Sequence, residues 1–346
     1  MATPTTAPAL IDGPACWLGR DLETSNEWIH RFSKDEVSEI EAAYAAALAR
    51  GKTLDTLTAG DFPLPSVSRQ LARAREALEN ERGAFLFRGY PTDGRPVEEL
   101  RFIYWGLSLN MGVPVCQSYK GDYIGDVTDI GLKDRLYTSN EAGGFHVDMT
   151  DVVGLFCLRA AKSGGLTQFV SSAAVHNEIA RTRPDLLVRL YEPVYWSHSR
   201  PSGMPGPLSF RMPTFSTFEG KFSCLYNPSK VKRAQTHPGI PPLDTEYLEA
   251  LALVEEIAHR SAFQVSMRFE PGDIQFLNNH VCIHGRTAYQ DYPEHDRKRY
   301  LLRIWLSVPN SRPLNPDRAE YWDVRPGAVR GGIGAECGRR VYTSLD

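Results

Sequence analysis

A histidine and an aspartate stand one residue apart in the segment GGFHVDMTD, residues 143–151. Imidazole nitrogens and carboxylate oxygens both bind first-row transition metals. The turn-like NEAGG precedes the pair and the apolar, β-branched VVGLFCLRA follows it, so the sequence predicts a strand end here. Two residues at this spacing lie on the same face of a strand. We therefore interpret His146 and Asp148 as two ligands of one metal ion.

The spacing alone is weak evidence, because such a pair is expected about once by chance in a chain with 9 histidines and 42 acidic residues. A second pair, His176 and Glu178, illustrates this. It lies in an alanine-rich run after Ser171 and Ser172, either of which can cap a helix. Side chains two apart on a helix point about 200° away from one another and cannot bind one ion. Only the first pair remains a candidate.

A third ligand must come from elsewhere in the chain, and His284 in NNHVCIHGRTAY is the best candidate. His280 lies in the same segment and competes with it. Either histidine could instead be a hydrogen-bonded residue of the core. Two histidines and one carboxylate form the ligand set of non-haem Fe(II) oxygenases, in which the remaining metal positions stay open.

Two arginines downstream indicate that acidic molecules bind near this site. Arg299 and Arg303 are four residues apart in the strand-like RYLLRIWLSVP, so they lie on one face. Two guanidinium groups on an apolar strand face are costly without anionic partners, and a guanidinium suits the bidentate binding of a carboxylate. Their Cα atoms are roughly 13 Å apart along a strand, which leaves Arg303 free for a second anion. We expect a small substrate with an acid group.

The composition is that of a folded globular protein, with 346 residues, 42% hydrophobic and 23% charged. The formal net charge of −3 and the absence of basic runs argue against nucleic acid as a partner. The N-terminus lacks the pattern of a signal peptide, and no apolar stretch has membrane-spanning length. We expect a cytoplasmic protein that does not bind membranes. Its six scattered cysteines contain no Cys-x-x-Cys, which argues against a zinc knuckle.

The predicted elements are helices first and short strands afterwards. Ser33 and Glu36 form a capping box before an alanine-rich helix that ends near Gly51. Further helices are expected over 66–83, 171–190 and 243–261, and strands over 83–90, 152–161, 168–172, 263–289 and 299–309. Without regular alternation of strands and helices, this order favours an antiparallel β-sandwich or barrel with a helical N-terminal layer.

The segments GFHVD, LFCLRAAKSGGLTQFVSSAAVHNEIARTRPDLL and PGDIQFLNNHVCIHGRTAYQDYPEHDRKRYLLRIWL resemble the taurine dioxygenase-like, or clavaminate synthase-like, family of Fe(II)/2-oxoglutarate-dependent oxygenases. The resemblance runs from about residue 17 to 313 and is dense over 136–190 and 265–310. It implies a mainly β fold with flanking helices and a double-stranded β-helix (jelly-roll) core. It also implies that His146, Asp148 and His284 bind Fe(II).

The same resemblance implies that Arg299 and Thr167 bind the cosubstrate 2-oxoglutarate, and that Arg303 faces an acid group of the substrate. The chain departs from the family pattern at Val147, where Thr is frequent, and at Tyr289, where Phe is common. Val147 is expected to point away from the metal, so this departure has little consequence.

We expect one catalytic domain over residues 1–346. It comprises a helical layer over about 1–82, a jelly-roll core over about 83–310 with a loop or lid insertion over about 199–243, and an irregular tail over 311–346 packed on the outside. Gln117 and Asn140 precede the metal motif and are candidates for the substrate pocket, although both could equally be ordinary strand or turn residues.

The expected reaction is oxidation of an unactivated C–H bond in a small acidic substrate, an amino acid or a related carboxylic acid. It would use O₂ and 2-oxoglutarate and release succinate and CO₂, with hydroxylation, desaturation and cyclisation all open as outcomes. Two alternatives use the same fold. A zinc-dependent hydrolase with the same ligands gives no reason for the arginine pair, and a non-catalytic jelly-roll binding protein would tolerate loss of a ligand.

Overall fold

The computed structural model describes residues 8–132, 136–198, 200, 203–333 and 341–342. Its α-helices are α1 (Gly19–Glu23), α2 (Lys34–Ala49), α3 (Val67–Asn80), α4 (Val97–Met111), α5 (Ser172–Thr182), α6 (Pro184–Leu190), α7 (Pro228–Ala234) and α8 (Thr245–His259). Four short 3-10 helices are η1 (Ala59–Asp61), η2 (Leu136–Thr138), η3 (His295–Arg297) and η4 (Pro316–Arg318). Within these ranges, no helix combines the length and apolar character needed to cross a membrane.

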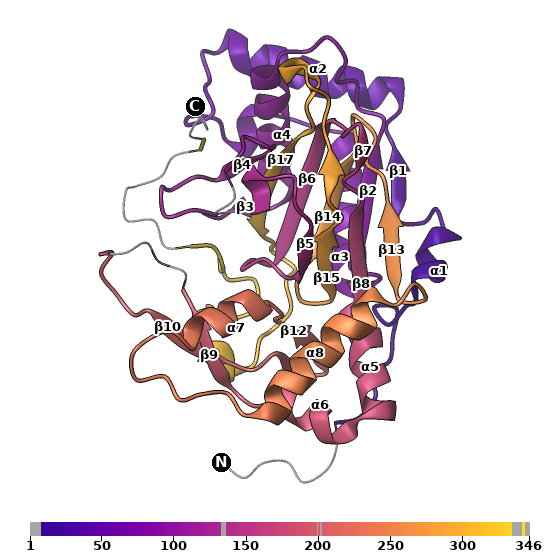
Figure 1. The fold of residues 1–346 in the computed structure, drawn as a ribbon. Helices are drawn as coiled ribbons and strands as arrows, with labels where there is room; N and C mark the ends of the chain where they lie inside the picture. The colour runs from indigo at the N-terminus through magenta and orange to yellow at the C-terminus, as the bar shows by residue number, and fades with distance from the viewer. Residues whose placement is uncertain (1–7, 133–135, 199, 201–202, 334–340, 343–346) are drawn as a thin grey trace.

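A seven-stranded sheet forms the centre of the molecule (Figure 1). Its order is β1 (Ile29–Arg31), β2 (Ala84–Arg88), β14 (Ile274–Asn278), β6 (Val152–Arg159), β17 (Tyr300–Ser307) and β3 (Val113–Pro114), with β4 (Ile124–Val127) also paired to β17. Only β1 and β2 pair in parallel among these strands. The antiparallel pairing expected from the sequence is therefore confirmed for most of the sheet.

A second, four-stranded antiparallel sheet has the order β13 (Gln264–Met267), β8 (Thr167–Ser171), β15 (Cys282–Arg286) and β5 (Gly143–His146). Three two-stranded sheets complete the structure. They pair β9 (Val194–Ser197) with β10 (Ser209–Met212), β11 (Phe215–Phe218) with β12 (Lys221–Cys224), and β7 (Ser163–Gly164) with β16 (Tyr289–Gln290).

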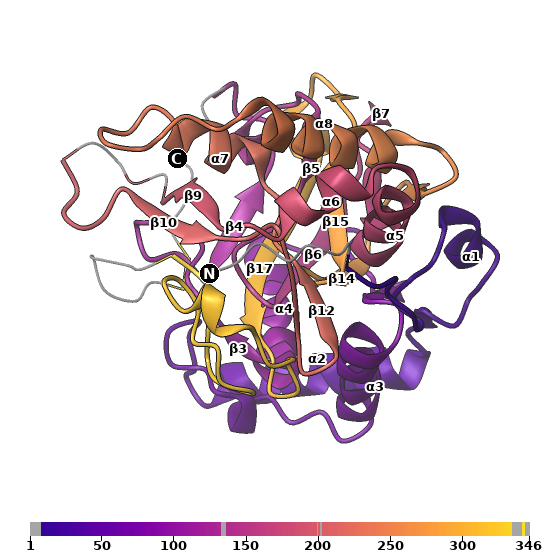
Figure 2. The same cartoon turned by 90° about the horizontal axis from the view of Figure 1, so that it is seen from below.

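The two faces of the large sheet belong to two different buried clusters, as the alternation of strand side chains requires. Phe85 and Phe87 of β2 pack in the cluster that contains the buried side chains of α2, α3 and α4. Leu86 packs in the other cluster, together with Phe169 of β8 and Ile283 of β15. Figure 2 shows the sheets between α2, α3 and α4 on one side and α7 and α8 on the other. Burial of each large apolar side chain contributes about 1.5–3 kcal/mol.

The capping box expected before α2 is present. The Ser33 hydroxyl accepts a hydrogen bond from Glu36 N at 3.2 Å, and the Glu36 carboxylate accepts one from Ser33 N at 2.9 Å. Ser171 likewise caps α5 by accepting from Ala174 N. The capping residues in the sequence therefore predicted the first residues of both helices correctly. Helix α4 was not expected, because most of its residues are buried and it shows no one-sided apolar stripe.

Three expectations about the fold need correction. The chain is a mixture of helices and strands rather than mainly β, since helices occupy more of the described residues than strands. The segment 199–243 contains β10, β11, β12 and α7, so it is not an irregular loop throughout. The tail is irregular over 311–333 apart from η4, but it does not simply pack on the outside. It buries the guanidinium groups of Arg312, Arg318 and Arg330. Residues 334–340 and 343–346 lie outside the described residues.

Candidate functional site

Adjacent strands bring two histidines together at one end of the four-stranded sheet. His146 ends β5 and His284 lies in β15, and the two are direct cross-strand partners with ring centroids 4.6 Å apart. Asp148 follows β5 by two residues. Its carboxylate oxygens lie 3.9 Å from His146 Nε2 and 3.7 Å from His284 Nε2. One ligand atom from each residue lies within 4.8 Å of the other two, a spacing that one metal ion could bridge.

Backbone contacts orient these three side chains. His146 Nδ1 lies 2.8 Å from Gly144 O, which can only accept a hydrogen bond, so Nδ1 carries the proton and Nε2 is left as the free donor atom for a metal. Asp148 N donates to the Asn279 side chain at 3.0 Å. Val147 between them is buried in the core, and its N–H donates to Tyr226 O. The expectation that Val147 points away from the site is therefore consistent with its packing.

The charge states of the site also suit a cation. Burial alone would raise the pKa of Asp148, but the charges of Arg303, His284 and His146 together hold the pKa below its usual value. Burial, followed by the charge of His146, lowers the pKa of His284 to about 3. At neutral pH the site therefore offers an ionised carboxylate and a neutral buried imidazole, the protonation states that metal binding requires.

A cavity of about 120 Å³ adjoins the three residues and is lined by both arginines and by Thr167. Arg299 is buried, and its Nη1 atom has no hydrogen-bond partner among the described residues. Thr167 is also buried, and its hydroxyl reaches Gln275 at 3.3 Å. A buried cation with an unpaired donor is costly, so the cavity fits a small molecule with a carboxylate.

Close backbone packing surrounds Arg299. Gly165 adopts a φ of +66°, and a Cβ atom there would lie 3.2 Å from Arg299 Nε. The adjacent Gly164 has a φ of +69°, and its Cβ would come within 2.2 Å of Ala288 O. Glycine at positions 164 and 165 therefore allows the chain to reverse before Thr167 and leaves space for the Arg299 guanidinium.

The sequence reasoning missed Arg286, which lines the same cavity. Arg286 and Arg299 both lie with their guanidinium carbon 4.9 Å from the centre of the Tyr289 ring. Burial, followed by the charge of Arg299, lowers the pKa of Arg286 to about 10. Its spacing from His284 is the signal that could have found it, because residues two apart in a strand share a face.

The Arg303 side chain lies between Asp148 of the metal site and the Gln117 amide. Its Nη1 atom is 3.8 Å from Asp148 Oδ1, and its Nε atom donates to Gln117 Oε1 at 2.8 Å. The Gln117 amide in turn donates to the backbone oxygens of Tyr123 and Arg303. Gln117 therefore positions Arg303 and does not line the cavity. Its buried amide has its hydrogen-bonding groups occupied within the protein.

Asn140 is exposed and does not line either of the two cavities beside the metal site. Its backbone oxygen accepts a hydrogen bond from Tyr289 N at 3.1 Å. The structure thus brings together His146, Asp148, His284, Thr167, Arg299 and Arg303, and it places Asn140 outside this group.

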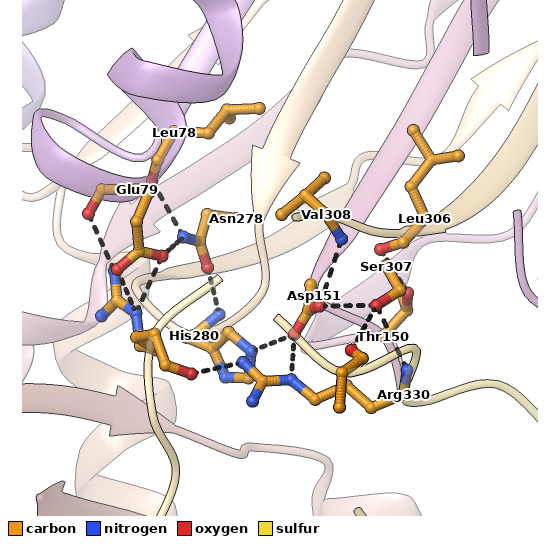
Figure 3. A network of polar contacts seen from close by, with 12 residues as sticks. Leu78, Glu79, Thr150, Asp151, Asn278, His280, Leu306, Ser307, Val308 and Arg330 are labelled. Atoms are coloured by element: carbon orange, nitrogen blue, oxygen red, sulfur yellow. Dashed lines mark hydrogen bonds and ion pairs between the residues drawn. The ribbon is translucent and has the colours of Figure 1, made fainter. Parts of the chain in front are cut away.

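His280 lies in a different buried network (Figure 3). Its Nε2 atom contacts Asp151 at 2.9 Å, and Arg330 Nε donates to the same carboxylate oxygen at 2.8 Å. Asp151 also accepts from the Ser307 hydroxyl and from Val308 N. His280 is therefore a hydrogen-bonded core residue and does not face the cavity beside His284.

Comparison with known proteins gives a consistent match. The family model "Taurine catabolism dioxygenase TauD, TfdA family" matches residues 49–305. The FR-33289 synthase of Streptomyces rubellomurinus is 32% identical over 330 residues, which cover 92% of this chain and 96% of that protein. The taurine hydroxylase-like protein SAT17 of Stachybotrys chartarum is 28% identical over 85% of this chain and 79% of its own length.

Solved structures share the fold at lower sequence identity. An asparagine oxygenase in complex with Fe(II), 3-hydroxyasparagine and succinate is similar with a TM-score of 0.65 and 18% identity, over 89% of this chain and 100% of that chain. The non-haem iron oxygenase OrfP in complex with Fe and alpha-ketoglutaric acid is similar with a TM-score of 0.61 and 17% identity, over 82% of this chain and 94% of that chain.

Proposed function

This chain belongs to the taurine catabolism dioxygenase TauD, TfdA family, and from that premise we propose that it is an Fe(II)- and 2-oxoglutarate-dependent oxygenase. The observation that carries the proposal is the position of the three candidate ligands beside a cavity lined by buried Arg299, whose Nη1 atom has no hydrogen-bond partner among the described residues. Each feature alone is also compatible with a purely structural role. Together they provide a place for a metal and a place for an acidic molecule that could bind to it.

His146, Asp148 and His284 would hold Fe(II) in this assignment. When bound, the ion would supply activation of O₂ coupled to oxidative decarboxylation of 2-oxoglutarate to succinate and CO₂. Arg299 would bind the distal carboxylate of 2-oxoglutarate, with Thr167 as a second donor. Arg286 would add positive potential to the same cavity. The remaining wall is largely apolar, which limits water and strengthens these ionic contacts; it includes Val153, Leu155, Phe269 and Leu277.

The substrate would be a small molecule with an acid group, an amino acid or a related acid, and its C–H bond would be oxidised by hydroxylation, desaturation or cyclisation. Arg303 supports this proposal, because its guanidinium lies beside Asp148 at the metal side of the cavity. Two similar structures carry amino acids in their descriptions, 3-hydroxyasparagine in the asparagine oxygenase and L-Arg in OrfP.

At the level of the fold, the family and the similar structures support a double-stranded β-helix core within one catalytic domain. In this assignment the large and small sheets are the two halves of that core. The segment 199–243 would act as a lid, because its helix α7 borders the opening next to His146.

The metal assignment is tested by replacing each ligand. We expect His146→Ala, Asp148→Ala and His284→Ala each to abolish Fe(II) binding and succinate release, while circular dichroism shows an unchanged fold. The reason is that the three residues form a site on a preformed sheet rather than its core. Exposed His295 provides a matched control, and His295→Ala should retain full activity.

The same assay separates the alternatives. Fe(II)- and O₂-dependent conversion of 2-oxoglutarate to succinate supports the oxygenase. Turnover that requires zinc and proceeds without O₂ would replace it with a hydrolase. An intact protein with all three ligands that never consumes 2-oxoglutarate would point to a binding protein instead.

A further inference from the structure

A second cavity, the outer chamber, opens on the other side of the metal site. It shares Tyr137, His146 and Asp148 with the inner cavity and has a volume of about 1100 Å³. Pockets that hold drug-sized ligands span roughly 300–1,000 Å³. The chamber therefore leaves room for the part of a small substrate that extends beyond the metal site, and the residues of its walls indicate the chemistry of that part.

Helix α8 provides one wall. Residues of α8 line the chamber as one stripe, since most of them are three or four residues apart: Leu248, Leu251, Ala252, Glu255, Glu256 and His259. The apolar part of this stripe suits a carbon chain. Both carboxylates of the stripe already have partners: Glu255 accepts a hydrogen bond from the Tyr226 hydroxyl at 2.8 Å, and Glu256 pairs with Arg260 at 3.0 Å. This wall therefore offers apolar contact more than free charge.

Helix α7 provides a second wall of the chamber, and this wall is basic rather than apolar. Lys230, Lys232 and Arg233 of this short helix line the chamber, and Arg200 joins them from the segment after β9. Lys232 and Arg233 are exposed, and the described residues include no carboxylate in an ion pair with either of them. Four basic side chains thus lie on the α7 side of the chamber, while its acidic side chains, Asp148, Glu255 and Glu256, belong to the metal site and to α8.

The half-buried His198, which follows β9, responds to two of these cations. Burial is the first cause that lowers the pKa of His198 to about 4, and the charges of Arg200, Lys230 and His237 lower it further. No carboxylate contributes in the opposite direction among the causes of this shift. Arg200 and Lys230 therefore create a positive potential at His198.

We propose that the outer chamber binds the far end of a substrate with two acid groups, and that its basic wall of Lys230, Lys232 and Arg233 takes a distal oxyanion of the phosphate or phosphonate type. The acid group at the near end would meet Arg303, and the chain between the two would lie along the apolar stripe of α8. This inference rests on the proposed function, because it takes the metal site as the place of reaction.

A doubly charged oxyanion fits this wall better than a carboxylate for two reasons. Several cations surround one chamber, and a second negative charge adds to the attraction of each. Lysine ammonium groups act as compact charges toward phosphate oxygens, while an arginine can donate two parallel hydrogen bonds to them. A neutral chain end would provide no countercharge for Lys232 and Arg233.

Three ligands of equal chain length test the proposal: 2-amino-5-phosphonopentanoate, 2-aminoadipate and 2-aminohexanoate. They differ only in a distal phosphonate, carboxylate or methyl group. Binding is measured through the change that each ligand causes in the visible absorbance of the anaerobic Fe(II)–2-oxoglutarate complex. We expect the phosphonate to bind best and the neutral ligand worst, with a difference of about tenfold or more from one additional charge-assisted contact.

The double variant Lys232→Gln/Arg233→Gln should remove most of this preference and leave the affinity for 2-aminohexanoate nearly unchanged. The matched control Lys34→Gln/Arg69→Gln removes the same charge from exposed positions on α2 and α3, and it should keep the preference. Equal affinity for the three ligands, no binding of any of them, or an unchanged preference in the α7 variant would overturn the inference. Failure of the Fe(II)–2-oxoglutarate absorbance to form would instead overturn the proposed function.

Discussion

Arg299 shows how a single side chain can be prepared for a molecule that the protein does not itself contain. Burial lowers its pKa, while the neighbouring Tyr289 acts in the opposite direction. Its backbone is fixed on both sides, since its N–H donates to the Asp291 carboxylate and its carbonyl accepts from the Thr128 hydroxyl. The guanidinium is thus held in place while Nη1 has no partner among the described residues, an arrangement that lowers the entropic cost of binding a carboxylate.

The variant Arg299→Ala tests this role at the residue scale. Loss of one partner of a buried charge pair costs about 3 kcal/mol, so we expect the dissociation constant of 2-oxoglutarate to rise by about 100-fold. Arg299→Lys keeps the positive charge but cannot donate two parallel hydrogen bonds to a carboxylate. Its dissociation constant for 2-oxoglutarate should therefore lie between those of the unsubstituted protein and Arg299→Ala. Titration of 2-oxoglutarate into the anaerobic Fe(II) protein measures both. An unchanged dissociation constant in Arg299→Ala would mean that another residue, with Arg286 the first candidate, binds the distal carboxylate.

At the scale of elements, the site depends on the loop that connects β5 to β6. Asp148 lies at the start of this loop and Asp151 lies at its end, next to the first residue of β6. Asp151 ties the loop to Arg330 of the tail and to His280 before β15. The tail also reaches the loop directly, because Gly332 N donates to Met149 O at 2.6 Å. Segments far apart in sequence therefore hold the metal-binding carboxylate in place.

Asp151→Asn should show how much this connection contributes. The substitution leaves the fully buried Arg330 guanidinium without its ionic partner, which costs about 3–5 kcal/mol of unfolding free energy. Asp323→Asn is the matched control, because Asp323 pairs with the exposed Arg325 and its loss should change stability far less. Urea denaturation measures both variants. Equal losses in the two would show that the buried network does not stabilise the loop.

The positions of many helices and strands could be predicted from the local sequence. A capping box located α2, a serine N-cap located α5, and glycine turns and apolar runs located β2, β6 and β17, because the causes of these elements lie within a few neighbouring residues. The pairing of β5 with β15 could not be predicted in this way. It depends on which strands meet across the fold, and it alone decides that His284 rather than His280 lies opposite His146.

At the scale of the whole molecule, three arginines of the C-terminal tail, Arg312, Arg318 and Arg330, belong to the buried interior. The tail was expected on the outside, yet Arg312 donates to Phe222 O and pairs with Glu79, and Arg318 is among the largest fully buried side chains. Composition gives only the number of such charges. Their partners come from residues that are distant in sequence, so burial of an arginine in an irregular segment leaves no local pattern to detect.

Acidification tests the packing of the whole molecule, because buried neutral histidines must gain protons when the chain unfolds. Burial lowers the pKa of His280 to about 4, despite the opposing effect of Asp151. The unfolded histidine has a pKa of about 6.5, so between these values the unfolded state binds the additional proton and stability falls as the pH falls. Aspartates with lowered pKa, such as Asp151, lose their stabilising effect only below about pH 4.

Between pH 7 and pH 5, the change in the free energy of unfolding therefore comes mainly from the histidines and not from the aspartates. We expect His280 alone to contribute a loss of about 2 kcal/mol in this range, and half-buried His198, whose pKa is also lowered to about 4, to act in the same direction. The variant His280→Gln can still donate to Asp151 but cannot titrate. Urea denaturation of the metal-free protein at pH 7, 6 and 5 should show a shallower pH dependence for this variant, by close to one proton. The same slope in both proteins would mean that His280 is protonated in the folded state.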